Sequence, residues 1–319
     1  MTSTLDRGTA PGSATSPAPA VDADAARTGA GTWVVLPTYN EVDNLEGIAA
    51  AILTTLPGAT LLVVDDGSPD GTGRLADELA AADPRVRVRH RAAKQGLGRA
   101  YLDGFDLAIA GGAIVVVQMD ADWSHDPGAL PALIGPIVAG EADLVIGSRY
   151  VRGGGVVDWG IGRRLISRGG SLFARTVLRL SPHDLTGGFK AWRAAALARI
   201  PFAGVHAGGY VFQIEMTFRA SRLGARVREV PITFRDRRVG QSKMSRRIVV
   251  EALVVVVTLR IEELWAVVRG RRGPGVIAGA PPSDDGTRPD DAAVPLASVE
   301  PLEIAATAEI AAAPEPGPR

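Results

Sequence analysis

The stretch that decides the fold is AIVVVQMDADWSH, residues 113–125. Its apolar, mostly β-branched run predicts a strand that is buried on both faces. The run ends in two aspartates, Asp120 and Asp122, separated by one residue. In an extended segment both side chains point the same way, so the carboxylates repel each other unless a cation lies between them. This arrangement favours a site for Mg²⁺ or Mn²⁺, which bind hard oxygen ligands.

A solvated turn is the alternative interpretation of the same residues. Aspartate and serine favour turns and helix N-termini, and Asp126-Pro127 is typical of a helix start. Because a lone Asp-x-Asp pattern is common by chance, its position directly after the apolar run is the feature that favours a metal site.

Elements of two kinds alternate around this strand. Short runs rich in Val and Leu take turns with helical patterns, as in mainly parallel sheets covered by helices on both faces. The expected strands are residues 32–37, 60–68, 85–90, 113–120 and 142–149, and the expected helices are residues 40–56, 70–83, 96–110 and 127–140. We therefore predict an α/β fold with a mainly parallel sheet.

Polar segments follow these strands directly, namely PTYNE, DDGSPDGT, DADWSH and GSRY. Ligands of such sheets bind outside the carboxyl ends of the strands, so this edge is the predicted site. In DDGSPDGT a carboxylate could accept hydrogen bonds from a ribose or a base. An Asx turn that caps the next helix through Asp70 or Thr72 is the equal alternative. Neither GxGxxG after the first strand nor GxxxxGK[ST] is present, so dinucleotide and P-loop sites lack support.

The composition excludes several kinds of chemistry. The 319 residues are 46% hydrophobic and include no cysteine, which excludes disulfides, thiolate metal sites and cysteine nucleophiles. The four histidines show no zinc-ligand spacing. The N-terminus lacks the apolar stretch of a secretory signal, so we expect a cytoplasmic protein.

Charge is unevenly spread although the net charge is zero. Residues 149–247 contain twenty Lys and Arg against five Asp and Glu, whereas residues 271–319 contain eight acidic residues against four basic ones. The basic half predicts either solvated helix faces or an electropositive surface for phosphate groups or an anionic membrane. It lacks an aromatic stacking surface or a recognised motif for nucleic acid, so we expect no nucleic-acid partner.

The chain divides into four parts. Residues 1–31 and 272–319 have the composition of disordered tails, the second of them acidic, and residues 32–245 form the folded domain. In residues 246–271 the uninterrupted apolar run is far shorter than the ~20 residues that span a bilayer. We predict an amphipathic helix that lies in the membrane interface. A helix packed on the core, or a Val-rich strand, is the alternative.

The order of the motifs is more specific than any one of them. VVLPTYNEVDNL, VVDDGSPDGT, MDADWSH and DLVIGSRY resemble the family-2 inverting glycosyltransferases, whose nucleotide-sugar-binding α/β fold is called GT-A. SRGGSLFARTVLRLSPHDLTGGFKAWR, GGYVFQIEMTFRASRLGARVREVPITFRDR and VGQSKMS are similar to the polyprenyl (dolichyl) phosphate mannose synthases. The similarity spans residues 33–250 and leaves out both tails.

This resemblance implies an activity. Such an enzyme transfers mannose from GDP-mannose to a polyprenyl phosphate with inversion, with Mg²⁺ or Mn²⁺ as its cofactor. It implies peripheral association with the cytoplasmic face of the membrane, and it allows for a membrane-protein partner. An acceptor that is already an anionic phosphate needs no strong base, but it must approach the donor diphosphate, and arginines offset that repulsion.

The resemblance also assigns roles to individual residues. Contacts to the nucleotide sugar are implied for Pro37, Tyr39, Asn40, Glu41, Val64, Asp66, Asp120, Ala121, Asp122, Ser124 and Arg149. Asp120 and Asp122 match the metal motif, with Asp122 as the direct ligand, and Ser124 stands where many relatives have Gln. Basic residues that hold phosphates are matched by Arg149, Arg163, Arg237, Arg238 and Lys243. Catalysis is implied for Asp122, Arg149 and Arg163.

Three other functions compete with this one. A glucosyl or N-acetylglucosaminyl transferase to polyprenyl phosphate would use a UDP-sugar, and such enzymes often carry two C-terminal spanning helices, which this sequence lacks. A non-catalytic nucleotide-binding protein would tolerate loss of Asp120 and Asp122. A processive polysaccharide synthase usually shows QxxRW after the core, and the sequence contains none.

Overall fold

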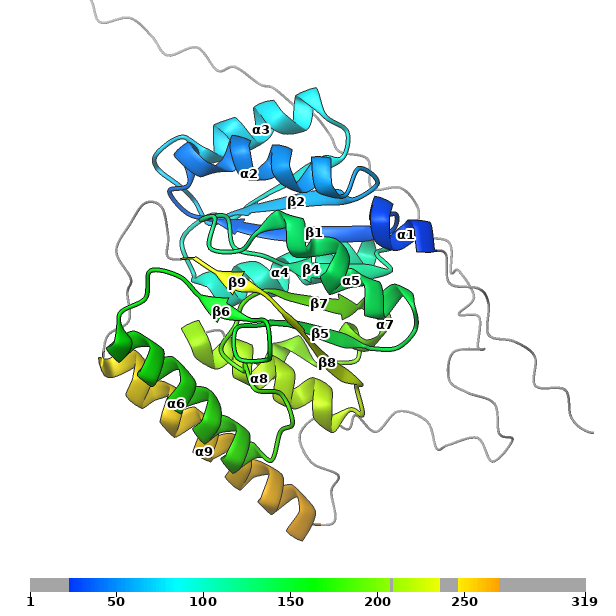
Figure 1. Ribbon diagram of the computed structural model, residues 1–319. Helices are drawn as coiled ribbons and strands as arrows, with labels where there is room; N and C mark the ends of the chain where they lie inside the picture. Colours follow the sequence, from blue (N-terminus) through cyan, green and yellow to red (C-terminus); the bar gives the residue numbers. More distant parts are fainter. Residues whose placement is uncertain (1–22, 207–208, 236–245, 270–319) are drawn as a thin grey trace, which may run out of the picture. The chain divides into compact units, whose positions relative to one another are not determined.

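A seven-stranded sheet is the framework of the computed structural model, which describes residues 23–206, 209–235 and 246–269 (Figure 1). The strand order is β3-β2-β1-β4-β7-β5-β8. The strands are β1 Thr32–Thr38, β2 Thr60–Asp65, β3 Val86–His90, β4 Val115–Gln118, β5 Leu144–Ser148, β7 Lys190–Arg193 and β8 Val227–Pro231. In this sheet β7 runs antiparallel to β4 and β5, and the other pairs are parallel. The predicted mainly parallel α/β sheet is confirmed.

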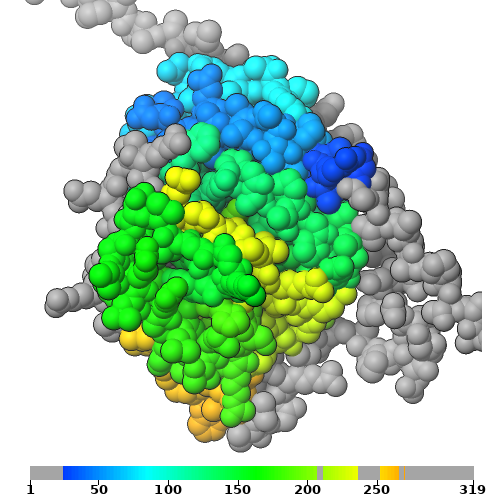
Figure 2. Space-filling model, viewed as in Figure 1, coloured from blue at the N-terminus to red at the C-terminus, as the bar shows by residue number. Residues whose placement is uncertain are grey.

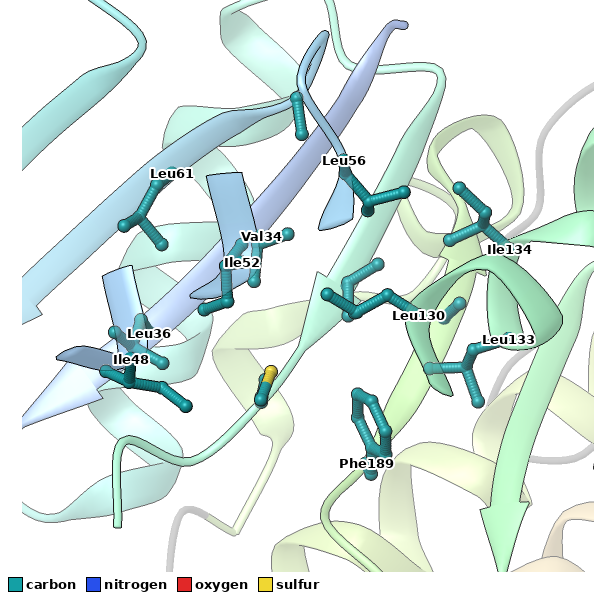
Figure 3. Packing of buried hydrophobic residues seen from close by; sticks show 14 of the residues in the cluster. Val34, Leu36, Ile48, Ile52, Leu56, Leu61, Leu130, Leu133, Ile134 and Phe189 are labelled. Atoms are coloured by element: carbon teal, nitrogen blue, oxygen red, sulfur yellow. The ribbon is translucent and has the colours of Figure 1, made fainter. Parts of the chain in front are cut away.

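Helices cover both faces of the sheet. The helices of the first part of the chain are α2 Val42–Thr55, α3 Thr72–Ala82, α4 Leu97–Ala110 and α5 Leu130–Val138. Side chains alternate along β1, so Val34 and Leu36 pack with α2 and α5, whereas Val35 packs on the other face with α4. Figure 3 shows the first of these cores, in which Ile48 and Ile52 of α2 meet the strands. Each such buried side chain contributes about 2 kcal/mol to stability.

The boundaries of the early elements agree with the sequence analysis. Each strand and helix that we predicted in residues 32–149 is present, with ends that differ by a few residues. The helix expected at 127–140 begins as a 3₁₀ turn, η1 Pro127–Ala129, before α5. Asp126 caps this turn, because its Oδ1 accepts a hydrogen bond from the Gly128 N–H at 2.8 Å. The predicted helix start at Asp126-Pro127 is therefore confirmed.

The second part of the chain adds elements around the end of the sheet. They are β6 Gly155–Val156, α6 Ile161–Leu178, α7 Ala194–Leu197, η2 Phe202–Gly204, α8 Gly209–Arg222 and β9 Thr233–Phe234. β6 and β9 pair as a small parallel sheet. A third apolar core joins α6, α8 and α9 (Arg246–Val268), with Leu178, Phe218 and Leu259 among its buried members.

The predicted C-terminal helix is present as α9. Val256 and Leu259 are buried against α6 and α8, and Glu263 pairs with Arg222 of α8 at 2.5 Å. The alternative of a helix packed on the core thus describes one face of α9, while its other face, which includes Leu264 and Trp265, is exposed. Among the described residues, no helix is long and apolar enough to cross a membrane.

Part of the segment that we predicted as a disordered N-terminal tail is helical. Helix α1 (Ala23–Thr28) lies inside residues 1–31, and the Gly58 N–H donates to the Thr28 carbonyl. Gly29 fits closely, because a Cβ added there would lie 2.7 Å from Leu56 Cβ. The prediction of disorder is therefore wrong for the last part of that segment. Residues 1–22 and the predicted acidic tail at 272–319 lie outside the described residues.

Candidate active site

The loop after β1 is fixed to the loop after β2. Asn40 has a positive φ of 61°, and its N–H donates to Ser68 Oγ at 3.0 Å. The Glu41 N–H donates to Thr72 Oγ1 at 3.0 Å. Tyr39 adjoins them, with the Lys94 ammonium 3.3 Å from its ring centroid. The predicted loop of Tyr39, Asn40 and Glu41 is thus a fixed structure at the carboxyl edge of the sheet.

Pro37 and Val64 are neighbours within the sheet. They face each other in the register of β1 and β2. The Val64 side chain is buried in the core under α4. If Val64 contacts a nucleotide, the contact must therefore come from its backbone.

Asp66 is buried and carries several hydrogen bonds. Its carboxylate accepts from Arg91 Nη1 at 2.5 Å, from the Gln95 N–H at 3.2 Å and from the Gly96 N–H at 3.1 Å. Asp66 thus holds the loop before α4 in place. The Asx turn that we considered for this segment is formed by Asp70, whose Oδ1 accepts from the Thr72 N–H at 3.0 Å. Sequence reasoning missed Arg91, because its partner lies in another loop.

The two aspartates after β4 have different surroundings. Asp120 Oδ1 accepts a hydrogen bond from the buried Tyr101 hydroxyl of α4 at 2.7 Å, and the Asp120 N–H donates to His125 Nδ1 at 3.3 Å. Asp122 is buried, and its Oδ1 accepts from the Ser124 N–H at 3.1 Å. Ala121 between them is buried in the core of the sheet. The loop therefore presents its two carboxylates from a fixed backbone.

Burial sets the protonation of the groups behind these aspartates. It raises the pKa of Tyr101 well above 10.0, and the nearby Asp120 charge adds to this. Burial also lowers the pKa of His125. Tyr101 therefore stays a hydrogen-bond donor and His125 stays neutral at physiological pH, which leaves His125 Nδ1 as an acceptor.

The oxygen ligands present fit a divalent cation for which the substrate and water supply the remaining ligands. Asp120 and Asp122 supply hard oxygens, and no group of three His, Cys, Asp or Glu that could hold a metal occurs among the described residues. Mg²⁺ and Mn²⁺ suit such open sites, with one or two carboxylates and substrate phosphates. Within the described residues the buried Ser124 Oγ makes no hydrogen bond, which fits a further ligand at this place.

Arg149 lies at the end of β5 and is paired with Asp184. Its Nε donates to Asp184 Oδ2 at 2.7 Å and its Nη2 to Asp184 Oδ1 at 2.6 Å, and Nη2 also donates to Thr186 Oγ1. Both members of the pair are buried. Burial alone would raise the pKa of Asp184, but the Arg149 guanidinium outweighs it and the pKa is lowered. Asp184 is therefore a carboxylate.

Arg163 lies in the first turn of α6. Its guanidinium carbon is 4.2 Å from the centroid of the Trp159 ring. Arg237, Arg238 and Lys243 lie outside the described residues. The chain that leads to them passes the aspartate loop, since the Arg235 N–H donates to the Ser124 carbonyl at 3.2 Å.

The structure brings most of the predicted residues to one edge of the sheet. Four supporting residues were not predicted, namely Arg91, Tyr101, Trp159 and Asp184. Asp184 lies in the quoted segment SPHDLTGGF and Tyr101 in GLGRAYLDGF, but neither segment shows by itself which residue it contacts. Together, the fixed carboxylates and the arginines lie at the edge of the sheet that the sequence predicted as the site.

The family follows from comparison with known proteins. A model described as glycosyl transferase family 2 matches residues 33–200, which is more than half of the chain. The chain therefore belongs to glycosyl transferase family 2, as its motifs indicated. It is 47% identical over 239 residues to an undecaprenyl-phosphate mannosyltransferase of Micrococcus luteus, a match that covers 75% of this chain and 98% of that relative. It is also 48% identical over 249 residues to a polyprenol monophosphomannose synthase of Mycolicibacterium smegmatis, covering 77% and 91%.

Solved structures support the fold. A crystal structure of glucosyl-3-phosphoglycerate synthase from Mycobacterium tuberculosis, in complex with Mn²⁺, uridine diphosphate and phosphoglyceric acid, superposes with a TM-score of 0.52 at 24% identity. The match covers 82% of this chain and 87% of that one. The predicted GT-A-like α/β fold is thereby confirmed.

Proposed function

We propose that this chain transfers mannose from GDP-mannose to a polyprenyl phosphate, with inversion at the anomeric carbon. The observation that carries the proposal is the placement of Asp120 and Asp122 after β4 and of Arg149 after β5 at one edge of a GT-A-like sheet, with Arg163 connected to them through Trp159, Phe234 and His125. Two relatives that share nearly half of their residues with this chain are named as mannosyltransferases or mannose synthases of polyprenyl phosphates.

The reaction is a single displacement. An oxygen of the acceptor phosphate forms a bond to C1 of mannose, and the bond from C1 to the GDP diphosphate breaks, with the electron pair leaving on GDP. Because the acceptor is already ionised, the protein has no need of a strong base. Its task is to bring two anions together, and positively charged groups such as Arg163 lower the cost of that approach.

The cofactor we propose is Mg²⁺ or Mn²⁺, held by Asp120 and Asp122. A divalent cation there would neutralise charge that develops on the departing diphosphate. Tyr101 orients Asp120, and the Ser124 N–H orients Asp122, so the chain itself fixes the carboxylates before the substrate arrives.

A lipid acceptor requires access to a membrane, and we propose that the α6–α9 surface provides it. Of the thirteen large hydrophobic side chains that are exposed in the described residues, four lie on α6 and six on α9. We define the α6–α9 surface by these ten residues, Ile161, Leu165, Ile166, Leu172, Leu253, Val254, Val257, Ile261, Leu264 and Trp265. The two helices pack against each other, and α6 forms part of the face seen in Figure 2. A patch of this kind is typical of an interaction surface rather than of solvent.

Charge indicates which membrane the surface suits. Helix α6 carries four arginines and no acidic residue. Its apolar side chains are strongly exposed, with Ile161 at 86% and Leu165 at 72%. An apolar surface flanked by arginines is the pattern of a helix that lies in the interface of an anionic bilayer. Arg163 lies in the first turn of the same helix, so contact with the bilayer would bring the lipid phosphate toward this arginine.

A panel of sugar nucleotides tests the proposal. The purified chain is incubated with vesicles that contain undecaprenyl phosphate, with Mg²⁺ or Mn²⁺, and with radiolabelled GDP-mannose, UDP-glucose or UDP-N-acetylglucosamine. We expect label in the lipid phase from GDP-mannose only, and a β-linked product by NMR. Transfer from a UDP-sugar instead would favour the alternative donor, and a retained anomeric configuration would contradict the single displacement.

A further inference from the structure

Trp159 contacts two of the arginines that we assign to phosphate binding, Arg149 and Arg163. The guanidinium carbon of Arg163 lies 4.2 Å from its ring centroid and that of Arg149 lies 5.3 Å away. An indole face attracts a guanidinium more strongly than other aromatic side chains do. A shared ring holds the two guanidinium groups side by side without adding a further negative charge that would compete with a phosphate.

The two arginines are held in different ways. Arg149 is also paired with the Asp184 carboxylate, which neutralises its charge. Arg163 is half-buried beside the indole. A ring face contacts the flat side of a guanidinium, so it does not consume the N–H donors that bind phosphate oxygens. The ring can therefore fix Arg163 while leaving its chemistry toward an anion intact.

Aromatic contacts connect Trp159 to the aspartate loop. Its ring meets Phe234 edge to face at a centroid distance of 5.3 Å, and Phe234 meets His125 in the same way at 5.5 Å. His125 Nδ1 in turn accepts a hydrogen bond from the Asp120 N–H. Trp159 is only 9% exposed, so this row of rings is packed rather than loose. The position of the indole is thus defined relative to the carboxylates.

We propose that Trp159 is a positioning residue, which holds Arg163 beside Arg149 for the acceptor phosphate at a set place relative to Asp120 and Asp122. It acts through the arginines and does not touch the reacting atoms. The inference rests on the proposed function, because it takes the acceptor to be a prenyl phosphate. It extends the proposed function by naming a residue whose substitution should affect binding of the acceptor but not of the donor.

The test compares Trp159→Leu and Trp159→Phe with Trp33→Leu. Trp33 is a matched control, since it is 8% exposed, carries Arg87 at 5.3 Å from its ring, and stands at the start of β1, away from the carboxyl edge. For each protein, KM is measured for undecaprenyl phosphate and for GDP-mannose. Calorimetry with citronellyl phosphate, a short prenyl phosphate, measures acceptor binding without turnover.

We expect Trp159→Leu to raise the KM of the acceptor and the Kd of citronellyl phosphate about tenfold. The KM of GDP-mannose should stay within about twofold, because Asp184 still holds Arg149 and the other donor contacts lie on other loops. Trp159→Phe, which keeps a ring, should lose less, and Trp33→Leu should leave both KM values unchanged. Equal increases in the two KM values, or an unchanged acceptor KM in folded Trp159→Leu, would overturn the inference.

Fluorescence provides a second readout in case Trp159→Leu does not fold. Citronellyl phosphate should change the tryptophan emission of the wild type, and this change should disappear in Trp159→Phe but persist in Trp33→Phe. A change that persists in Trp159→Phe would contradict the inference. If the wild type binds no prenyl phosphate, both the proposed function and this inference are contradicted. If the wild type binds it and the Trp159 variants bind it equally well, only the inference is contradicted.

Discussion

Asp184 holds Arg149 through both carboxylate oxygens, at 2.6 and 2.7 Å, and Oδ2 also accepts the Arg149 backbone N–H at 3.0 Å. The two residues are separated by 35 positions in the chain and both are buried. A buried pair of this kind fixes the backbone at the end of β5.

Asp184→Asn should therefore destabilise the protein strongly. It leaves Arg149 without its countercharge in a buried place, which costs about 3–5 kcal/mol. Urea denaturation followed by circular dichroism measures the change. Asp77→Asn is the control, because Asp77 pairs with His90 at an exposed position and its loss should cost less than about 1 kcal/mol. Similar small losses in both variants would show that the Asp184 pair has no such role.

Asp122→Asn should abolish mannosyl transfer and leave the fold intact. The amide keeps an oxygen for the Ser124 N–H but loses the charge that holds a divalent cation. We expect a decrease in kcat/KM of at least about a hundredfold, with a thermal unfolding midpoint close to that of the wild type. Normal turnover in this variant would contradict the metal role.

Tyr101→Phe should weaken metal binding without disturbing the core. It removes the hydroxyl that donates to Asp120 but keeps the ring that stacks on Phe105 and Phe212. Loss of a partner that orients a metal ligand typically costs about 10–100-fold in affinity. Titration of Mn²⁺ by electron paramagnetic resonance, with GDP present, measures this directly. Unchanged Mn²⁺ affinity would show that Asp120 needs no support from Tyr101.

Polar substitutions on the α6–α9 surface should weaken membrane binding. Leu165→Ser combined with Trp265→Ser removes one large exposed apolar side chain from each helix. We expect less protein to float with vesicles that contain anionic lipid, and little flotation of any variant with zwitterionic vesicles. Ile114→Ser is the control, since Ile114 is 63% exposed but lies at the start of β4. Equal flotation of all variants would reject the surface as a membrane contact.

Lys190 should make stability depend on pH. Burial lowers its pKa from 10.5 to about 7, although its ammonium nitrogen donates to the Gln213 carbonyl and to Thr217 Oγ1. Between pH 7 and pH 10.5 the Lys190 side chain binds a proton in the unfolded chain but not in the folded chain, so the free energy of unfolding rises with pH. From pH 7 to pH 9 the unfolding midpoint of the wild type should rise relative to that of Lys190→Met. Parallel pH profiles would contradict the shifted pKa.

The early part of the fold could be predicted because local signals there agree with one another. Val-rich runs, glycine turns and the cap at Asp126 each mark an element boundary, and the structure has its elements at those places. After Tyr150 we predicted no elements before residue 246, because α6 has arginines among its apolar residues along most of its length and α8 is too evenly buried to show a helical pattern. Both helices pack in the third core, to which α9 contributes from a distant part of the chain.

The candidate site could be predicted as a place and as a set of residue types. The rule that ligands bind at the carboxyl edge of the sheet located it, and the motifs named Asp120, Asp122 and Arg149. The supporting contacts could not be predicted, since Tyr101 and Asp184 reach their partners across the fold rather than along the chain. A pattern in the sequence shows that a residue is charged, but not which countercharge it meets.

The reversed direction of β7 has a mechanical consequence. Because this strand runs opposite to its neighbours, the segment that precedes it, residues 184–189, passes the carboxyl edge of the sheet. Asp184 at one end of this segment accepts hydrogen bonds from Arg149. Phe189 at the other end stacks on His125, with 4.8 Å between the ring centroids. One short stretch of backbone thus sets the distance between the end of β5 and the loop that follows β4. Adding or removing a single residue there would change the spacing of Arg149 and His125 even if Asp184 and Phe189 were both kept.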